Sequence, residues 1–148
     1  MHSRVDTLQE EHIRLRSLLD RCEAAPSPEL SSLLNQLREA LRPHVEAKQA
    51  LYAEAVRSVQ AVDNKPTELS LLGIFRTNLG VVSGAVLSFL EAPDPQPARQ
   101  RERLRTMVGA LRSLMDTEEK VVFPLCRKYS VGPGPGRPLR PRIEESRR

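Results

Sequence analysis

Aromatic residues are scarce in this chain. They make up 3% of its 148 residues, and tryptophan is absent, so aliphatic side chains must fill its core. Only two cysteines occur, Cys22 and Cys126, and they form no CxxC pair, which indicates reduced packing residues rather than a zinc or redox motif. No GxSxG, phosphate-binding loop or HExxH motif is present. We therefore predict that the protein is not an enzyme.

Signals for secretion, membranes and nucleic acids are also missing. The first twelve residues lack the apolar segment of a secretory signal, so we expect a cytoplasmic protein. The most apolar run, 69–90, has Arg76 and Asn78 near its middle, where a membrane helix tolerates them worst, and we predict no membrane span. The net charge of +4 comes partly from an arginine-rich end. Without RNA-binding aromatics or a DNA-reading motif, we expect no nucleic-acid partner.

Proline and glycine divide the chain into helical segments, and no segment alternates apolar and polar residues like a strand. Ser27 before Pro28, and Pro66 at the start of the next segment, are typical helix starts. Short connections between long helices predict an all-α, antiparallel up-down-up-down four-helix bundle over 1–129, followed by a basic, disordered Pro/Gly/Arg-rich tail over 130–148. The expected helices span 3–24, 28–60, 66–91 and 97–129.

Apolar residues three and four apart predict the inward stripe of each helix. Each stripe has polar residues near its middle, namely His12, then His44 and Lys48, then Asn78, then Glu118. Because buried polar groups need partners, we predict that these five side chains form one polar layer. The full stripes are Val5, Leu8, His12, Leu15, Leu19 and Cys22; Leu30, Leu34, Leu37, Leu41, His44, Lys48, Leu51 and Ala55; Leu71, Phe75, Asn78, Val82, Ala85 and Phe89; and Leu104, Met107, Leu111, Leu114, Glu118, Val121 and Leu125.

The third helix is apolar nearly all round, which is unusual for a surface helix of a monomer. Small residues on it would let another helix approach closely. One interpretation is a homodimer, or another protein partner, bound through Gly80, Val81, Gly84 and Leu87. The alternative interpretation is a helix that its own neighbours and loops cover more fully.

Motifs on these stripes suggest a family. Glu11-His12 is followed by HVEAKQALY from His44 to Tyr52, and the second half supplies Asn78 and then LMDTEEKVVFP from Leu114 to Pro124. Over residues 5 to about 127, this arrangement resembles the hemerythrin-like (HHE cation-binding) family. The resemblance implies a four-helix bundle whose histidines and carboxylates hold two irons for dioxygen chemistry, sensing or iron handling.

Several positions depart from the family pattern. His12, His44 and Glu118 match ligand positions, but Lys48 replaces a bridging carboxylate, and Asn78 and Leu114 replace histidines. A charged ammonium has no lone pair for a metal, and leucine has no donor atom. We therefore predict a degenerate site without a cofactor, in which Lys48 neutralises Glu118 and Leu114 closes the second half. The expected function is a non-enzymatic regulatory or protein-interaction module.

A reduced metal site is the alternative. His12, His44 and Glu118 form a set of two histidines and one carboxylate, which suits non-haem iron and is also accepted by zinc. In this interpretation, the protein is a metal-binding hemerythrin-like protein with a single metal or an asymmetric iron site, acting in oxygen, redox or iron sensing. Tyr52, one turn beyond Lys48, could hydrogen-bond the polar layer, but we expect it at the rim with its hydroxyl in water.

Overall fold

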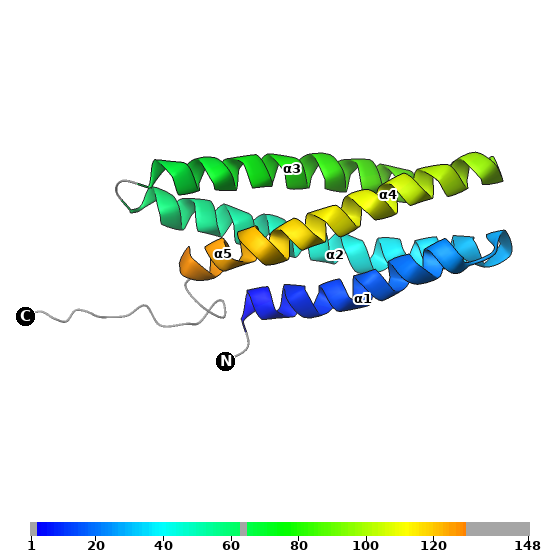
Figure 1. The fold of residues 1–148 in the computed structure, drawn as a ribbon, viewed down its shortest axis with the longest axis horizontal. Helices are drawn as coiled ribbons and strands as arrows, with labels where there is room; N and C mark the ends of the chain where they lie inside the picture. Colours follow the sequence, from blue (N-terminus) through cyan, green and yellow to red (C-terminus); the bar gives the residue numbers. More distant parts are fainter. Residues whose placement is uncertain (1–2, 63–64, 130–148) are drawn as a thin grey trace, which may run out of the picture.

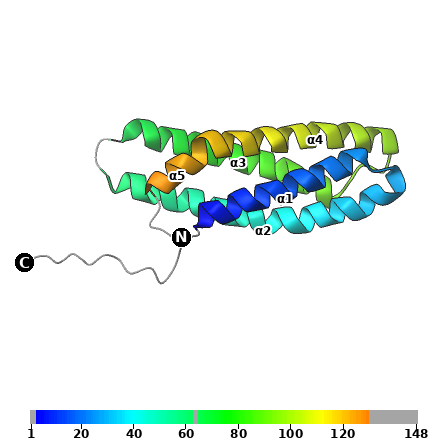
Figure 2. The ribbon, with the colours of Figure 1, turned by 60° about the horizontal axis from the view of Figure 1, so that its bottom comes forward.

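A computed structural model describes residues 3–62 and 65–129, and these residues form helices without any strand. Their long axes run along the longest dimension of the molecule (Figures 1 and 2). Helix α2 packs against α1 and α3, and α4 packs against the same two helices, which makes a helical bundle. The elements are α1 (Arg4–Ala24), α2 (Ser27–Gln60), α3 (Pro66–Glu91), α4 (Pro97–Thr117), η1 (Glu118–Val122) and α5 (Phe123–Tyr129).

The predicted helices agree closely with the observed ones, because their ends carry clear local signals. Ser3 caps α1: its hydroxyl accepts from the Asp6 backbone N–H at 3.1 Å, and the Asp6 carboxylate accepts from the Ser3 N–H at 2.9 Å. Pro66 begins α3 as predicted. The predicted cap at Ser27 is wrong, since Pro26 is the cap residue and Ser27 already belongs to α2. The predicted tail over 130–148 lies outside the described residues.

The core is aliphatic and has two parts. One apolar cluster includes Leu19, Leu37 and Leu111, and the other includes Leu8 and Leu51. Buried polar residues lie between the two clusters on three segments: His12 between Leu8 and Leu15 on α1, Lys48 between Val45 and Leu51 on α2, and Glu118 between Met115 and Val122 on the α4–η1 segment, with His44 one turn before Lys48. The polar layer therefore lies between two apolar cores. The predicted inward stripes of the first two helices are confirmed, because all of their residues are buried.

The predicted stripe of the third helix is wrong. Asn78 is exposed, and so is Leu71, whereas the buried residues of α3 are Leu72, Leu79, Ser83, Val86 and Leu90. The helix is therefore rotated by about one residue from the predicted phase. Its apolar residues surround it on all sides, so spacing alone could not choose the buried face.

The fourth predicted helix contains a π-helical turn, η1, which also changes its buried face. Val121 is exposed and Leu125 is half-buried, although both were predicted inward, while Val122, Phe123 and Cys126 are buried. A π turn places one extra residue in a helical turn. That extra residue moves the inward positions after Glu118 forward by one.

Helix α3 leaves much of its apolar surface uncovered. Ile74 is 62% exposed and Val81 is 66% exposed, and a Cβ atom added at Gly80 or Gly84 would have no atom within 4 Å beyond its own stretch of helix. By length and composition, α3 is the one helix in the described part of the chain that is apolar enough to cross a membrane, and only 22% of its most apolar window is buried. The prediction that this segment does not span a membrane stays a prediction.

Candidate functional site

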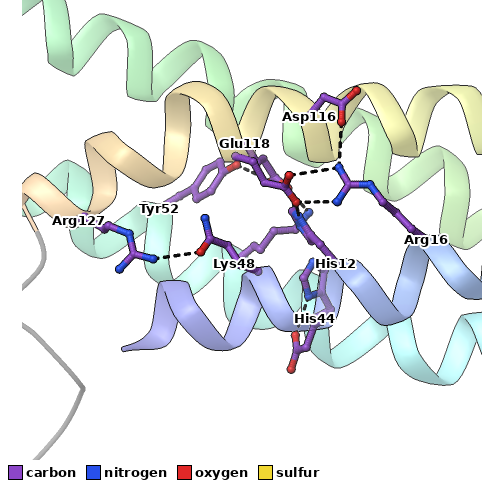
Figure 3. Close-up of polar contacts among 11 residues, drawn as sticks. His12, Arg16, His44, Lys48, Tyr52, Asp116, Glu118 and Arg127 are labelled. Carbon is purple, nitrogen blue, oxygen red and sulfur yellow. Dashed lines mark hydrogen bonds and ion pairs between the residues drawn. The ribbon is translucent and has the colours of Figure 1, made fainter. Parts of the chain in front are cut away.

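Glu118 is the centre of the buried polar layer (Figure 3). It is fully buried at the first position of η1. Lys48 Nζ donates to Glu118 Oε1 at 3.0 Å, and the Tyr52 hydroxyl donates to Glu118 Oε2 at 2.6 Å. His12 Nε2 lies 3.3 Å from Oε1 without hydrogen-bond geometry. Both carboxylate oxygens are thus engaged inside the bundle.

Lys48 and Glu118 form a buried ion pair between α2 and η1. Burial lowers the pKa of the Lys48 ammonium, and the charge of Glu118 opposes that shift. Burial alone would raise the pKa of Glu118, but the contacts with His12, Lys48 and Tyr52 outweigh it and lower the pKa. The carboxylate is therefore ionised near neutral pH, opposite the lysine. Burial also raises the pKa of the Tyr52 hydroxyl, so Tyr52 acts as a donor to Glu118.

Each buried histidine is held by a carboxylate nearer the surface. His12 Nδ1 lies 2.7 Å from Glu119 Oε2, and His44 Nδ1 lies 2.6 Å from Glu11 Oε1. An ionised carboxylate only accepts hydrogen bonds, so each Nδ1 carries a proton. The rings contact each other with centroids 5.0 Å apart. Each Nε2 is buried without a hydrogen-bond partner among the described residues.

The layer continues to the surface through Glu119. Arg16 donates to Glu119 Oε2 at 2.8 Å and to Asp116 Oδ1 at 2.9 Å. These bonds hold the Glu119 carboxylate against His12 from the solvent side, and the pKa of Glu119 is lowered, because Arg16 and His12 outweigh the effect of its partial burial. A chain of polar contacts therefore links solvent to the centre of the bundle.

The π turn explains why two successive glutamates reach one histidine. Glu118 and Glu119 open η1, and their carboxylates lie on either side of the His12 ring, near Nε2 and Nδ1 respectively. Widened turns of this kind occur often at functional sites. Here the turn brings both carboxylates toward α1.

The structure brings together four of the five residues predicted for the polar layer: His12, His44, Lys48 and Glu118. Leu114 is buried beside them in the apolar cluster, as the stripe predicted. Asn78 is exposed on α3 and takes no part in the layer, so this prediction is wrong. The cause is the rotated phase of α3.

Three further residues take part in the layer. Tyr52 is fully buried and bonded to Glu118, so the favoured rim position is wrong and the alternative, a hydrogen bond to the polar layer, is confirmed. Its position one turn after Lys48 was the available signal. Glu11 and Glu119 belong to the family motif. Their roles as histidine partners depend on which histidine each carboxylate can reach on a neighbouring helix, and sequence spacing does not reveal that reach.

The donor set fits a metal poorly. Carboxylates behind both Nδ1 atoms are the usual arrangement for orienting metal-binding histidines, and the two free Nε2 atoms are consistent with it. However, the Lys48 ammonium occupies Glu118 Oε1, where its charge would repel a cation. Within 3–62 and 65–129, no three His, Cys, Asp or Glu residues gather in a group that could hold a metal ion.

The space beside the layer is very small. A cavity of about 10 Å³ lies next to His44 and Lys48 and is otherwise lined by leucines and Met115. That volume is about what one water molecule needs. An organic molecule does not fit against the ion pair in this arrangement of the helices.

We expect the Lys48→Met variant to lose about 3 to 5 kcal/mol of unfolding free energy, because it leaves the buried charge of Glu118 uncompensated. Urea unfolding followed by circular dichroism measures this loss. The matched control is Lys128→Met, which removes an exposed lysine paired with Glu68 at 2.9 Å and should change stability little. The double variant Lys48→Met/Glu118→Gln should be more stable than Lys48→Met. An unchanged midpoint for Lys48→Met would show that the pair is not buried as described.

Acid should destabilise the fold through His44. Burial, followed by the charge of Lys48, lowers the pKa of His44 from 6.5 to about 3. Between these values the unfolded chain binds a proton that the folded chain does not, so the unfolding free energy falls as pH decreases from 6.5 toward 3. The slope from this group approaches about 1.4 kcal/mol per pH unit. We expect His44→Gln to show a flatter profile from pH 7 to 5 in urea unfolding; equal slopes for both proteins would contradict a neutral, buried His44.

Comparison with protein-family models, with curated proteins and with solved structures finds no significant match to this chain. The hemerythrin-like resemblance therefore stays a prediction that rests on the motif residues. What the polar layer does must be inferred from its own chemistry.

Proposed function

We propose that this protein is a hemerythrin-like helical bundle in which a lysine–glutamate pair stands in place of the metal pair, and that it acts as a non-enzymatic regulatory or protein-interaction module. The Lys48–Glu118 pair supports the replacement of the metal pair, because its two buried groups hydrogen-bond to each other at the centre of the bundle. Glu118 makes no contact with solvent, and the neighbouring cavity is too small for an organic substrate.

The order of the helices supports this assignment. In Figures 1 and 2, α1 ends and α2 begins at one end of the bundle, while α2 ends and α3 begins at the other. An antiparallel up-down-up-down bundle has this order. The exposed position of Asn78 weighs against an equivalent second half-site, so the resemblance is strongest over α1, α2 and η1.

The interaction surface that we propose is the outer face of α3, defined by Ile74, Gly80, Val81 and Gly84. Contiguous exposed apolar surface of this kind is uncommon on monomers and marks interaction sites. The absence of side chains at the two glycines leaves open space in which another helix can approach. The fourth predicted interface residue, Leu87, is half-buried against the core and lies at the edge of this face. A second copy of the chain is the partner proposed here.

We expect the protein to form a homodimer in solution through this face, and Ile74→Glu to shift it to a monomer, because a carboxylate would then be desolvated in an apolar interface. Size-exclusion chromatography with light scattering measures the mass. The matched control is Ile13→Glu on α1, where the isoleucine is 70% exposed, and this variant should stay dimeric. A monomeric wild-type protein at micromolar concentration would remove the dimer, and binding of the wild type to lipid vesicles instead would indicate a membrane contact.

A metal-binding function is the second candidate, and one observation favours it. The Nε2 atoms of His12 and His44 are buried without a hydrogen-bond partner among the described residues, the two ring centroids are 5.0 Å apart, and each Nδ1 is held by a carboxylate. In this proposal His12, His44 and Glu118 hold a single metal or an asymmetric iron, after Lys48 gives up its bond to Glu118, and the protein senses oxygen, redox state or iron.

Elemental analysis of protein purified from iron-supplied cells separates the two candidates. The first predicts substoichiometric iron that does not change in His12→Ala. Stoichiometric iron that is lost in His12→Ala or His44→Ala, but kept in the Glu46→Ala control on the exposed face of α2, would establish the second. Lys48→Met should then raise iron occupancy, because it removes the competing cation.

A further inference from the structure

Helix α3 carries a second regular stripe, distinct from the one that packs into the core. Its members are spaced three and four residues apart, and all of them are exposed: Leu71, Ile74, Asn78, Val81 and Ala85. This is the spacing of the contact positions in a two-stranded coiled coil. We call this stripe the α3 seam. Helix α3 lies along one edge of the bundle in Figure 1, so its exposed side is open to another helix.

Asn78 is the one polar side chain of the α3 seam and lies at its centre. An amide group has both donors and an acceptor, and it would lose its hydrogen bonds to water without replacement if only apolar groups covered it. A partner that covers the seam must therefore present a polar group to Asn78. The apolar interior of a membrane has no such group.

Charge narrows the choice of partner further. Arg76 is the one charged residue between Leu69 and Leu90. Because it lies two residues before Asn78, it is on the opposite side of the helix from the α3 seam. The seam thus offers no ion pair to a charged partner, and it brings no like charges against a second copy of itself. A second α3 supplies an amide at the position of Asn78 and the same apolar residues on either side of it.

The positions of the apolar residues select the direction of the second helix. In a parallel, in-register pair every seam residue meets its own copy, so Asn78 faces Asn78 of the second copy and the two amides hydrogen-bond to each other. If one helix is instead reversed about Asn78, Ile74 faces the residue four positions after Asn78, which is Val82. Val82 is half-buried against the core, so the reversed pair does not bring the two seams together.

We propose that Asn78 determines the specificity of the homodimer: it pairs with Asn78 of a second copy and fixes the two α3 helices parallel and in register. This inference rests on the dimer proposed under the previous heading. A single asparagine in an otherwise apolar seam sets the register and the oligomeric state of coiled coils, at some cost in stability. Here Leu71, Ile74, Val81 and Ala85 supply the apolar contacts, and Asn78 restricts them to one alignment.

Opposite charges placed at position 78 test the pairing. We expect Asn78→Asp and Asn78→Lys each to weaken the dimer about tenfold or more, because like charges then face each other. An equimolar mixture of the two variants should regain the dimer mass. Size-exclusion chromatography with light scattering at low ionic strength, where charges are least screened, measures the masses. The matched control is Arg76→Glu, which should stay dimeric. Both positions are exposed, and circular dichroism confirms that the variants are folded.

The direction of the helices is tested in the same way. A mixture of Leu71→Asp and Leu71→Lys should regain the dimer mass, whereas a mixture of Leu71→Asp and Ala85→Lys should not, because these two positions face each other only in the reversed pair. Recovery in the second mixture would overturn the parallel direction. A dimeric wild type whose Asn78→Asp and Asn78→Lys variants stay dimeric, or do not recombine when mixed, would overturn the role of Asn78 and leave the dimer standing. A monomeric wild type would overturn both.

Discussion

The interior of this bundle depends on the ion pair between Lys48 and Glu118. Each charge alone would be costly to bury; the two charges offset each other, and the Tyr52 hydroxyl also donates to Glu118. A pair of this kind need not increase stability over apolar residues of the same volume. The pair therefore affects how α2 and η1 are aligned rather than the total free energy of folding.

The polar layer specifies one alignment of three elements. Lys48 on α2 and His12 on α1 both meet Glu118 on η1, and the leucines of the two apolar clusters lie on either side. A shift of any helix by one turn would place a charge against leucine. Leucines alone would tolerate such a shift, because they interdigitate in several registers. A single polar layer in an aliphatic core thus fixes the register, as buried polar residues do in coiled coils.

The sequence was sufficient for most of the fold and for part of the site, for physical reasons that differ between helices. Proline-rich breaks mark the helix ends, and the polar backs of α1 and α2 identify their inward faces, so His12, His44 and Lys48 were predicted correctly. Helix α3 has no polar back, and Asn78 was misplaced. The π turn at Glu118 has no distinctive local sequence, so the inward shift to Val122 was not predictable. The partners of the histidines depend on reach across helices, which only coordinates supply.

Helix α3 is apolar on all sides, which is why the sequence pattern did not identify its buried face. The same property leaves apolar side chains exposed on its outer face. Internal packing accounts for Leu72, Leu79 and Val86, but Ile74 and Val81 contribute nothing to the core. Exposed isoleucine and valine beside glycines weaken a helix in isolation, so internal stability does not explain them. The polar layer aligns α1, α2 and η1, whereas α3 contributes no residue to it and is held against them by apolar packing through residues such as Leu72, Leu79 and Val86.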